Sequence, residues 1–331
     1  MRVLAASRGD AASYYRITSP FSILHYRGLD VEMRAPTIDD AGKFDVLWLQ
    51  MHATPIVEIV AREFKARGGK LVYDVDDWLF ELPPSWPSYD HFYARGYGVV
   101  TDLLLFHERL IQLADVVTTT TPYLAGKLRE RFDVRVEVLP NCIMAGDWDI
   151  LPEKHHDRGG PVLGWMGTGN HWDDWMEIVD SVATALDDVD GHLALIGAPE
   201  MMACFPAELK ARTLWQPLVP MARFQQVREL MKGADVGLAW ATDRLEISRC
   251  RSPLKALQWG AAGKPIVASA TVYGEFSHAY GVTLPNFLRH DLEVALMGAY
   301  QRDTALRAQA DAWQREVFAQ HVEQLLLRHH L

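Results

Sequence analysis

Short apolar runs alternate with amphipathic stretches along most of the chain. The apolar runs predict buried strands at residues 3–6, 31–35, 44–50, 70–73, 114–121, 135–139, 162–167, 192–196, 234–241 and 266–268. Apolar residues at helical spacing predict helices at residues 14–27, 55–67, 99–113, 122–132, 172–186, 224–231 and 253–262, and again from residue 291 onward. Strands and helices that alternate in this way predict βαβ units and parallel sheets.

One predicted helix starts among several cations. Ser252 is a favourable N-cap and Pro253 suits the first helical position, so a helix is expected to begin there and to expose its first amides. Arg249, Arg251 and Lys255 surround this start. Cations repel one another and the positive end of a helix dipole, so we expect an anion such as a phosphate or diphosphate between them. The alternative is a surface helix with solvated cations.

Acidic residues follow the predicted strand at residues 70–73. Asp74, Asp76 and Asp77 crowd negative charge at the carboxyl end of that strand, where open α/β sheets bind ligands. Neighbouring carboxylates raise one another's pKa, which prepares a base. We therefore expect Asp76 or Asp77 to orient or deprotonate a hydroxyl. The alternative is that these carboxylates cap local amides.

Two loops offer further candidate contacts. Residues 81–98 are rich in proline, glycine and aromatic residues, and Trp86 and Tyr89 are expected either to stack on an acceptor or to pack within the loop. The predicted strand at residues 162–167 ends in a glycine-rich turn, which can bring backbone amides close to a phosphate.

Composition narrows the class of protein. The 331 residues suffice for two domains, and 49% hydrophobic with 23% charged residues is typical of globular chains. The net charge of -10 does not favour broad nucleic-acid binding, although a local basic groove stays open. Three scattered cysteines and the solvated pair His155 and His156 predict neither disulfides nor a metal site. With neither a signal peptide nor an apolar run of membrane-spanning length, we expect a cytoplasmic protein without a membrane span.

The segment SPLKALQWGAAGKPIVAS, residues 252–269, resembles the donor-binding segment of GT-B glycosyltransferases of the bacterial "group 1" type. In this resemblance Lys255 takes the place of the lysine that binds the donor diphosphate. Gln258 takes the place of a glutamate that binds ribose, and Cys250 stands where its partner glutamate is usual. Both acidic members of the family pattern are therefore replaced, although an amide still donates to and accepts from a hydroxyl.

Other segments resemble the same family in chain order. The segments YR…P…L…G near residue 16, ADVVTTTTPYLAGKL at residues 114–128 and PNCI at residues 140–143 have the family's order and place. The turn after residue 166 resembles a G-T-x-x-H-x-x-D loop, and residues 74–80 resemble a D-x-D-D-x-x-F sequence on the acceptor side. The family resemblance disfavours reading those aspartates as the metal-binding DxD motif of the other glycosyltransferase fold.

The resemblance implies a GT-B fold, with two Rossmann-like, doubly wound parallel-sheet domains facing a central cleft. The expected parts are an acceptor-side domain at residues 1–145, a donor domain at residues 146–310, and a C-terminal helix at residues 311–331 that packs back on the first domain. The implied donor-binding residues are Gly167, Thr168, His171, Val219, Arg249, Arg251, Ser252, Lys255 and Gln258. Asp76 and Asp77 are the implied catalytic residues, with Arg16, Asp74, Trp86 and Tyr89 on the acceptor side.

The implied function is transfer of a sugar from a nucleotide-diphosphate sugar to an acceptor hydroxyl, without a metal or other cofactor. The expected acceptor is a glycan or an envelope precursor, and a modified base in DNA is a less favoured one. A nucleotide-sugar epimerase of the same fold and a noncatalytic sugar-binding protein are the alternatives. The sequence specifies neither the donor base and sugar, nor the stereochemical course, nor the oligomeric state.

Overall fold

A computed structural model describes residues 1–84, 86, 89–93, 103–141, 159–197, 199–217, 224–273, 282–283, 292, 295–296 and 324–326. The chain forms two compact units. The first contains Met1–Cys142, Cys250–Ser252 and Arg315–Leu331, and the second contains Ile143–Arg249 and Pro253–Gln314. The short stretch Cys250–Ser252 therefore belongs to the first unit, although the residues on both sides of it belong to the second.

The first unit is built on a six-stranded sheet with the order β2-β1-β3-β4-β5-β6, in which every neighbouring pair is parallel. Its strands are β1 Arg2–Ser7, β2 Asp30–Met33, β3 Val46–Gln50, β4 Lys70–Val75, β5 Val116–Thr119 and β6 Val136–Val138. The first strand pairs with both the second and the third, so the order reverses direction between β1 and β3. This is the flavodoxin-like variant of the doubly wound fold.

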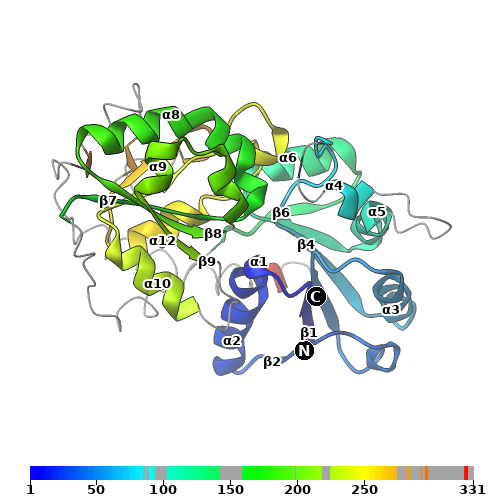
Figure 1. Ribbon diagram of the computed structural model, residues 1–331. Helices are drawn as coiled ribbons and strands as arrows, with labels where there is room; N and C mark the ends of the chain where they lie inside the picture. Colours follow the sequence, from blue (N-terminus) through cyan, green and yellow to red (C-terminus); the bar gives the residue numbers. More distant parts are fainter. Residues whose placement is uncertain are drawn as a thin grey trace. The chain divides into compact units, whose positions relative to one another are not determined.

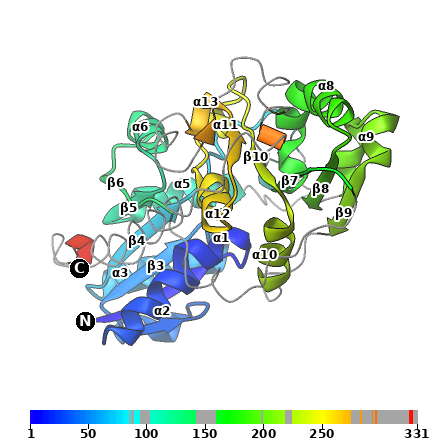
Figure 2. The same ribbon diagram turned by 90° about the vertical axis from the view of Figure 1, so that its left-hand side faces the viewer.

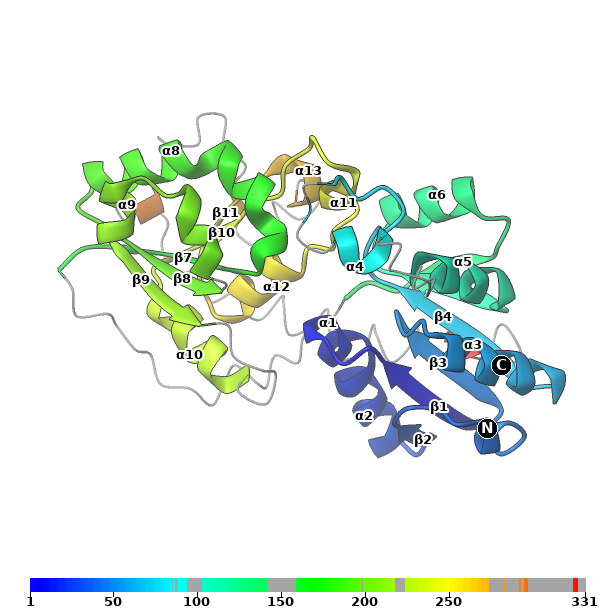
Figure 3. The same cartoon turned by 45° about the vertical axis from the view of Figure 1, so that its right-hand side comes forward.

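Helices cover both faces of the first sheet (Figures 1 and 3). They are α1 Ala11–Ser13, the π-helix η1 Tyr14–Thr18, α2 Ser19–Tyr26, the 3₁₀ helix η2 Ile38–Asp40, α3 Pro55–Ala66, α4 Tyr89–Tyr93, α5 Leu103–Leu113 and α6 Pro122–Arg131. Phe21 of α2 packs edge-on against Trp48 of β3, with ring centroids 5.1 Å apart. Leu325 and Leu326, near the C-terminus, belong to the same buried cluster.

The second unit has a six-stranded sheet with the order β12-β11-β10-β7-β8-β9, again with parallel neighbours throughout. Its strands are β7 Val162–Gly167, β8 His192–Gly197, β9 Thr213–Pro217, β10 Val236–Ala239, β11 Ile266–Ala268 and β12 Val282–Thr283. Counted within the unit, this is the Rossmann order 3-2-1-4-5-6, which reverses between β7 and β10.

The second sheet also lies between two helical layers. Its helices are η3 Gly169–His171, α8 Trp172–Asp188, η4 Pro199–Cys204, α9 Ala207–Ala211, α10 Phe224–Gly233, α11 Glu246–Arg249, α12 Leu254–Ala261 and α13 Ala270–Tyr273. Figures 1 and 2 show α8 and α9 on one face and α10 and α12 on the other. The helix predicted at residues 172–186 is confirmed as α8, and Trp175, Val179 and Val182 of its predicted apolar stripe lie in the core. Met176, which was assigned to the same stripe, is instead 54% exposed.

Two glycines leave the space in which α12 packs against the second sheet. A Cβ on Gly164 of β7 or Gly237 of β10 would come within 2.3 Å of the ring of Trp259. The fully buried indole of Trp259 therefore lies directly on the two strands where side chains are missing. Because residues four apart share a face of a helix, this contact also fixes where Lys255 lies, one turn earlier.

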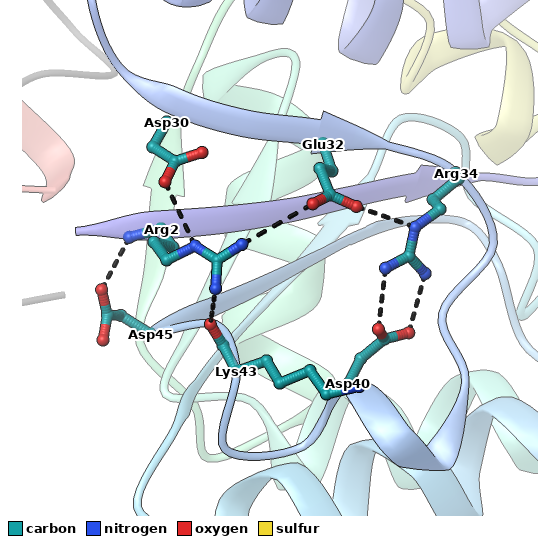
Figure 4. A network of polar contacts seen from close by, with 7 residues as sticks. All are labelled: Arg2, Asp30, Glu32, Arg34, Asp40, Lys43 and Asp45. Atoms are coloured by element: carbon teal, nitrogen blue, oxygen red, sulfur yellow. Dashed lines mark hydrogen bonds and ion pairs between the residues drawn. The ribbon is translucent and has the colours of Figure 1, made fainter.

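A network of ion pairs runs from the amino ends of β1 and β2 to Arg34, after β2, and Asp40, in η2 (Figure 4). The Arg2 guanidinium lies between Asp30 and Glu32, and its Nη1 donates to the carbonyl oxygen of Lys43 at 2.8 Å. Arg34 forms a bidentate pair with Asp40, with N···O distances of 2.7 and 2.8 Å. These hydrogen bonds hold the pKa of the Asp40 carboxyl well below its usual range.

Several local expectations need correction. The N-cap of α12 is Pro253 rather than Ser252, and the hydroxyl of Ser252 instead accepts a hydrogen bond from Asn141. The aromatic loop contains a short helix, α4, at Tyr89–Tyr93. The 3₁₀ helix η4 and helices α9 and α11 were not predicted, because each is too short to show periodicity. Most of the expected C-terminal helix lies outside the described residues.

Candidate functional site

Each sheet has one position where polar side chains are expected to meet a ligand. In open α/β sheets, ligands bind outside the carboxyl ends of the strands, at the point where the strand order reverses. That point lies between β1 and β3 in the first unit and between β7 and β10 in the second. Both positions carry clusters of polar and charged side chains.

A buried ion pair anchors the strand ends of the first unit. Side chains alternate along a strand, so Asp74 shares a face of β4 with the core residue Val72. Arg16, from the π-helix that covers this face, pairs with the carboxylate of Asp74, and its Nε lies 2.9 Å from Oδ2. Thr118 Oγ1 donates to the same carboxylate at 2.6 Å. The side chains of Arg16 and Asp74 are 1% and 0% exposed.

This burial changes the interpretation of two predicted acceptor-side residues. Both charged groups of the Arg16–Asp74 pair are enclosed within the first unit, so neither is placed to contact an acceptor directly. Arg16 also donates to the side chain of Asn141 at 3.3 Å. We interpret the pair as support for the strand ends rather than as part of a binding surface.

The next acidic residue, Asp76, belongs to a different network. Gln50, the last residue of β3, donates from Nε2 to Asp76 Oδ1 at 3.0 Å. Ser13 donates from its hydroxyl to Gln50 Oε1 at 3.1 Å and also lies 2.9 Å from Asp10 Oδ1. Arg8, which follows β1, pairs with Asp10. The ends of β1, β3 and β4 thus meet in one hydrogen-bonded group.

The electrostatics of this group favour a proton acceptor. Burial raises the pKa of Asp76 to about 7, with further contributions from the nearby carboxylates, while Arg8 opposes the shift. Burial also raises the pKa of Asp77, against the opposing charges of Arg251 and Arg8. A carboxyl group with a pKa near neutrality can take up a proton from a substrate and release it again. Asp76 is therefore the strongest candidate base among the described residues.

The other predicted residues of the first unit are held by local contacts. Trp86 is 4% exposed, and the Arg251 guanidinium lies 5.6 Å from the centroid of its ring. Ser252 Oγ accepts from Asn141 Nδ2 at 2.6 Å. Tyr89 stacks on Tyr93 with ring centroids 4.6 Å apart. The described residues Trp86 and Tyr89 therefore contact their own unit, which was the alternative to direct acceptor contact.

In the second unit, the glycine-rich turn leads into a tightly packed histidine. A Cβ on Gly167 would lie 2.8 Å from His171 Cδ2 and 2.6 Å from the ring of Trp165, so this close packing requires glycine. His171 Nδ1 lies 2.6 Å from Asp174 Oδ2. The other oxygen of Asp174 accepts from the Thr242 amide at 2.8 Å and from Ser248 Oγ at 3.2 Å. Asp174 thus connects the turn after β7 to the segment after β10.

Lys255 completes this cluster. Its Nζ lies 3.1 Å from His171 Nε2, 3.3 Å from His171 Nδ1 and 4.8 Å from the centroid of the Trp165 ring. A carboxylate only accepts hydrogen bonds, so Asp174 selects the tautomer with the proton on Nδ1. The near-equal distances to the two ring nitrogens place the lysine ammonium over the face of the neutral imidazole. A cation is thereby held at the amino end of α12, beside the strand-order reversal.

The remaining predicted donor-binding residues are distributed differently. Arg249 pairs with Glu246 of its own helix at 2.9 Å, rather than with the Lys255 cluster. Gln258 is 3% exposed. Thr168 is the N-cap of η3, next to His171. Val219 lies outside the described residues. Within the described part of the chain, no group of three or more His, Cys, Asp or Glu side chains is arranged to hold a metal ion.

Several site residues were not predicted. Gln50 was assigned only as the end of a strand, and Arg8, Asp10 and Ser13 were not assigned to the site. Asp174 was noticed in a motif but not assigned to the site. One feature of the sequence could have indicated Gln50: it is the polar last residue of the otherwise apolar strand VLWLQ, residues 46–50.

Fold and strand-end chemistry together place the chain in a structural class. Two parallel-sheet α/β units with polar switch points fit the expected GT-B architecture, and structure comparison confirms this fold. The alpha-glucosyltransferase AGT in complex with UDP matches with a TM-score of 0.64 and 12% identity, covering 99% of this chain and 100% of that one.

Other glycosyltransferase structures match over similar lengths. AviGT4, a glycosyltransferase involved in Avilamycin A biosynthesis, has a TM-score of 0.60 and 12% identity, covering 99% of this chain and 98% of that one. The lipopolysaccharide outer core galactosyltransferase WaaB has a TM-score of 0.54 and 10% identity, with 99% of each chain covered. No protein-family model and no curated protein matches the sequence. Among the described helices, none is long and apolar enough to cross a membrane.

Proposed function

We propose that the protein is a glycosyltransferase that moves a sugar from a nucleotide-diphosphate sugar to an acceptor hydroxyl without a metal ion. The carrying observation is the contact between Lys255 and His171 at the switch point of the second sheet, at the amino end of α12. A fixed cation and a helix amino terminus at one position are suited to a diphosphate. The GT-B architecture supports the same proposal.

The second unit would bind the donor. As the bond between the sugar and the diphosphate breaks, negative charge grows on the leaving group, and Lys255 would stabilise it electrostatically. Lys255 thus supplies the charge that a metal ion would otherwise bring. Gly167 and Thr168 would let the backbone approach the donor closely. Arg249, Arg251, Ser252, Val219 and Gln258 remain predicted donor-binding residues.

The first unit would supply the acceptor chemistry. A bond forms between the acceptor oxygen and the sugar carbon, and Asp76 would take the hydroxyl proton while the nucleoside diphosphate leaves. Asp77 would help to orient the hydroxyl. The acidic character of this group favours a neutral acceptor such as a glycan or an envelope precursor, because like charges repel a polyanion. The free thiols of Cys204 and Cys250 suit a cytoplasmic setting, which is part of the proposal.

A modified base in DNA is the second candidate acceptor. The observation that favours it is the match to an alpha-glucosyltransferase in complex with UDP-glucose and DNA, with a TM-score of 0.63 and 13% identity. Transfer assays with neutral glycans and with duplex DNA carrying hydroxymethylated bases distinguish the two acceptors. Formation of an epimerised nucleotide sugar, with no transfer, would identify the alternative enzyme class.

A thermal-shift screen tests the donor site. UDP, GDP, dTDP, CDP, ADP and their sugars are compared without added metal on the native protein, on Lys255→Ala and on Lys210→Ala. Lys210 is an exposed lysine of α9 and serves as the matched control. A ligand that binds the folded state raises its stability by mass action. We expect one nucleotide to stabilise the native protein and Lys210→Ala but not Lys255→Ala, and the absence of any stabilisation would overturn the proposal.

A further inference from the structure

A buried amide separates Asp76 from a second carboxylate. Gln50 is 0% exposed, and it donates from Nε2 to Asp76 Oδ1 at 3.0 Å. Its Oε1 lies 3.1 Å from Ser13 Oγ, which in turn lies 2.9 Å from Asp10 Oδ1. Ser13 Oγ also accepts a hydrogen bond from the Gly9 amide at 3.2 Å. The side chains therefore form one continuous line from Asp76 to Asp10.

The hydroxyl of Ser13 has one proton and two acceptors within reach. It donates either to Gln50 Oε1 or to Asp10 Oδ1, and the two distances differ by little. A buried amide likewise presents a donor on one side and an acceptor on the other. Both groups can therefore reverse their direction of donation without moving away from their neighbours.

We propose that Gln50 and Ser13 form a reversible hydrogen-bond relay that lets Asp76 gain and lose a proton without leaving a buried polar atom unpaired. This proposal rests on the proposed function, in which Asp76 accepts a proton. Gln50 and Ser13 are positioning residues in it, because they act through Asp76.

The relay has two states. When Asp76 is ionised, the Gln50 amide donates to it and Ser13 donates to Gln50 Oε1, an arrangement that the N···O and O···O distances of 3.0 and 3.1 Å allow. When Asp76 is protonated, its hydroxyl donates to Gln50 Oε1 after the amide turns over. The Gln50 amide then donates to Ser13 Oγ, and Ser13 donates to Asp10. A buried polar group without a partner is costly, so a relay that satisfies both states keeps protonation reversible.

The charges around Asp76 support such a role. The groups that act on it are Arg8, which follows β1, and the carboxylates of Asp10, Asp74 and Asp77. Burial and these carboxylates raise the pKa of Asp76 to about 7, against the opposing charge of Arg8. Both protonation states are therefore populated near neutral pH, and the relay has to accommodate both.

NMR of the unmodified full chain tests the relay directly. Aspartate carboxyl carbons and glutamine side-chain amides are labelled with ¹³C and ¹⁵N and followed between pH 5 and 9, with Asp76→Asn and Gln50→Met used for assignment. We expect the Gln50 amide signals to shift with the same midpoint as the Asp76 carboxyl, because turning the amide changes its partners. Gln50 amide signals that stay constant while Asp76 titrates would overturn the relay.

A variant pair gives an independent test. Gln50 is bonded to Asp76 in both states of the relay, but only the bond to the ionised carboxylate is charge-assisted and therefore the stronger of the two. Gln50→Met should therefore raise the pKa of Asp76 by roughly one unit, a tenfold fall in the ratio of ionised to protonated form at a given pH. Ser22→Ala, an exposed serine whose hydroxyl bonds only locally to Thr18, should leave that pKa unchanged. An unchanged pKa in folded Gln50→Met would contradict the relay. These readouts need no transfer activity, so they fail separately from the proposed function.

Discussion

The two sheets share an architecture but differ in the charged groups at their switch points. In the first unit, the ends of β1 and β4 bring together three carboxylates, Asp10, Asp76 and Asp77, around Arg8. In the second, the turn after β7 and the start of α12 bring together His171 and Lys255, and the one carboxylate, Asp174, is buried behind the histidine. The same fold thus serves two chemistries, because the residues just beyond the strands are free of the packing constraints that fix the strands themselves.

The units also bury a carboxylate by different means. Asp74 of the first unit is matched by the full positive charge of Arg16. Asp174 of the second unit is 2% exposed and is matched by His171, a backbone amide and a hydroxyl. Breaking a buried ion pair costs much folding stability, because removing one partner leaves the other charge buried without compensation.

The largest expected effect therefore comes from Arg16→Met. We predict a loss of about 3–5 kcal/mol in the free energy of unfolding, measured by denaturant titration, because Asp74 is left buried without its partner. Arg135→Met is the control, since Arg135 pairs with Glu137 at the surface and its side chain is 56% exposed. The surface variant should change stability by about 1 kcal/mol or less. Equal losses in the free energy of unfolding for the two variants would show that burial of the ion pair does not determine its contribution to stability.

The next effect concerns the chemistry of the acidic group. Asp76→Asn keeps the shape of the side chain but cannot take up a proton, so the transfer rate should fall by about 10²–10⁴-fold. The exposed Asp39→Asn is the control and should leave the rate unchanged. A rate that survives in Asp76→Asn would remove the base from the mechanism.

The same residue links activity to pH. The transfer rate should rise with pH through about 7, because the pKa of Asp76 is raised to about 7 and its ionised form is the base. The folded state favours protonated Asp76, so its stabilising contribution is complete below about pH 4 and is lost as pH rises through 7. At pH 8, Asp76→Asn should therefore unfold at a higher denaturant concentration than the native protein. Lower stability of the variant at that pH would contradict the raised pKa.

A smaller effect is expected where the second unit seats α12. A Cβ on Gly237 would lie 2.3 Å from Trp259 Cγ, so Gly237→Ala has to displace the indole and should cost about 1–3 kcal/mol. Gly126→Ala, in α6, has open space around its new Cβ and should be neutral or slightly stabilising. Unfolding titrations compare the two. Weaker nucleotide binding in Gly237→Ala would sharpen the comparison, because Lys255 depends on the same helix.

The smallest effect lies away from both switch points. Arg34→Gln removes the bidentate pair with Asp40. The Arg34 side chain is 41% exposed, and Asp40 keeps its hydrogen bonds from the Thr37 amide and hydroxyl, so the loss should be about 0.5–1 kcal/mol at neutral pH. The pKa of Asp40 is lowered in the fold, so the contribution of the pair is complete above about pH 4 and shrinks as pH falls toward the lowered pKa. A difference between variant and native protein that is as large at pH 2 as at pH 7 would contradict the assignment.

Much of the fold could be predicted from pattern alone. The apolar run at residues 266–268 coincides with β11, and the helix expected from Pro55 to Arg67 is confirmed as α3, Pro55–Ala66. Short elements such as α9 and α11 escaped prediction because four or five residues show no periodicity. The predicted N-cap of α12 was wrong by one residue, because the Ser252 hydroxyl accepts a hydrogen bond from the Asn141 side chain instead of from a helix amide.

The candidate site could be predicted only in part. Asp76 and Lys255 stand out locally, one as an acidic residue after a strand and the other as a cation at a helix start. The relay through Gln50 and Ser13 could not be found in this way, because its residues lie 37 positions apart and meet only once the sheet is formed. The same holds for Asp174, whose contact with Thr242 spans 68 positions. The order of the strands in the sheet determines which of these distant residues come into contact, and that order cannot be read from a local segment of sequence.

The most direct test of the proposed donor site is a crystal structure with the nucleotide diphosphate that stabilises the protein in the thermal screen. We predict diphosphate oxygens within hydrogen-bond distance of Lys255 Nζ and of the first amides of α12. A nucleotide bound elsewhere, with no contact to Lys255, would contradict the assignment of the second unit's basic group as the donor site.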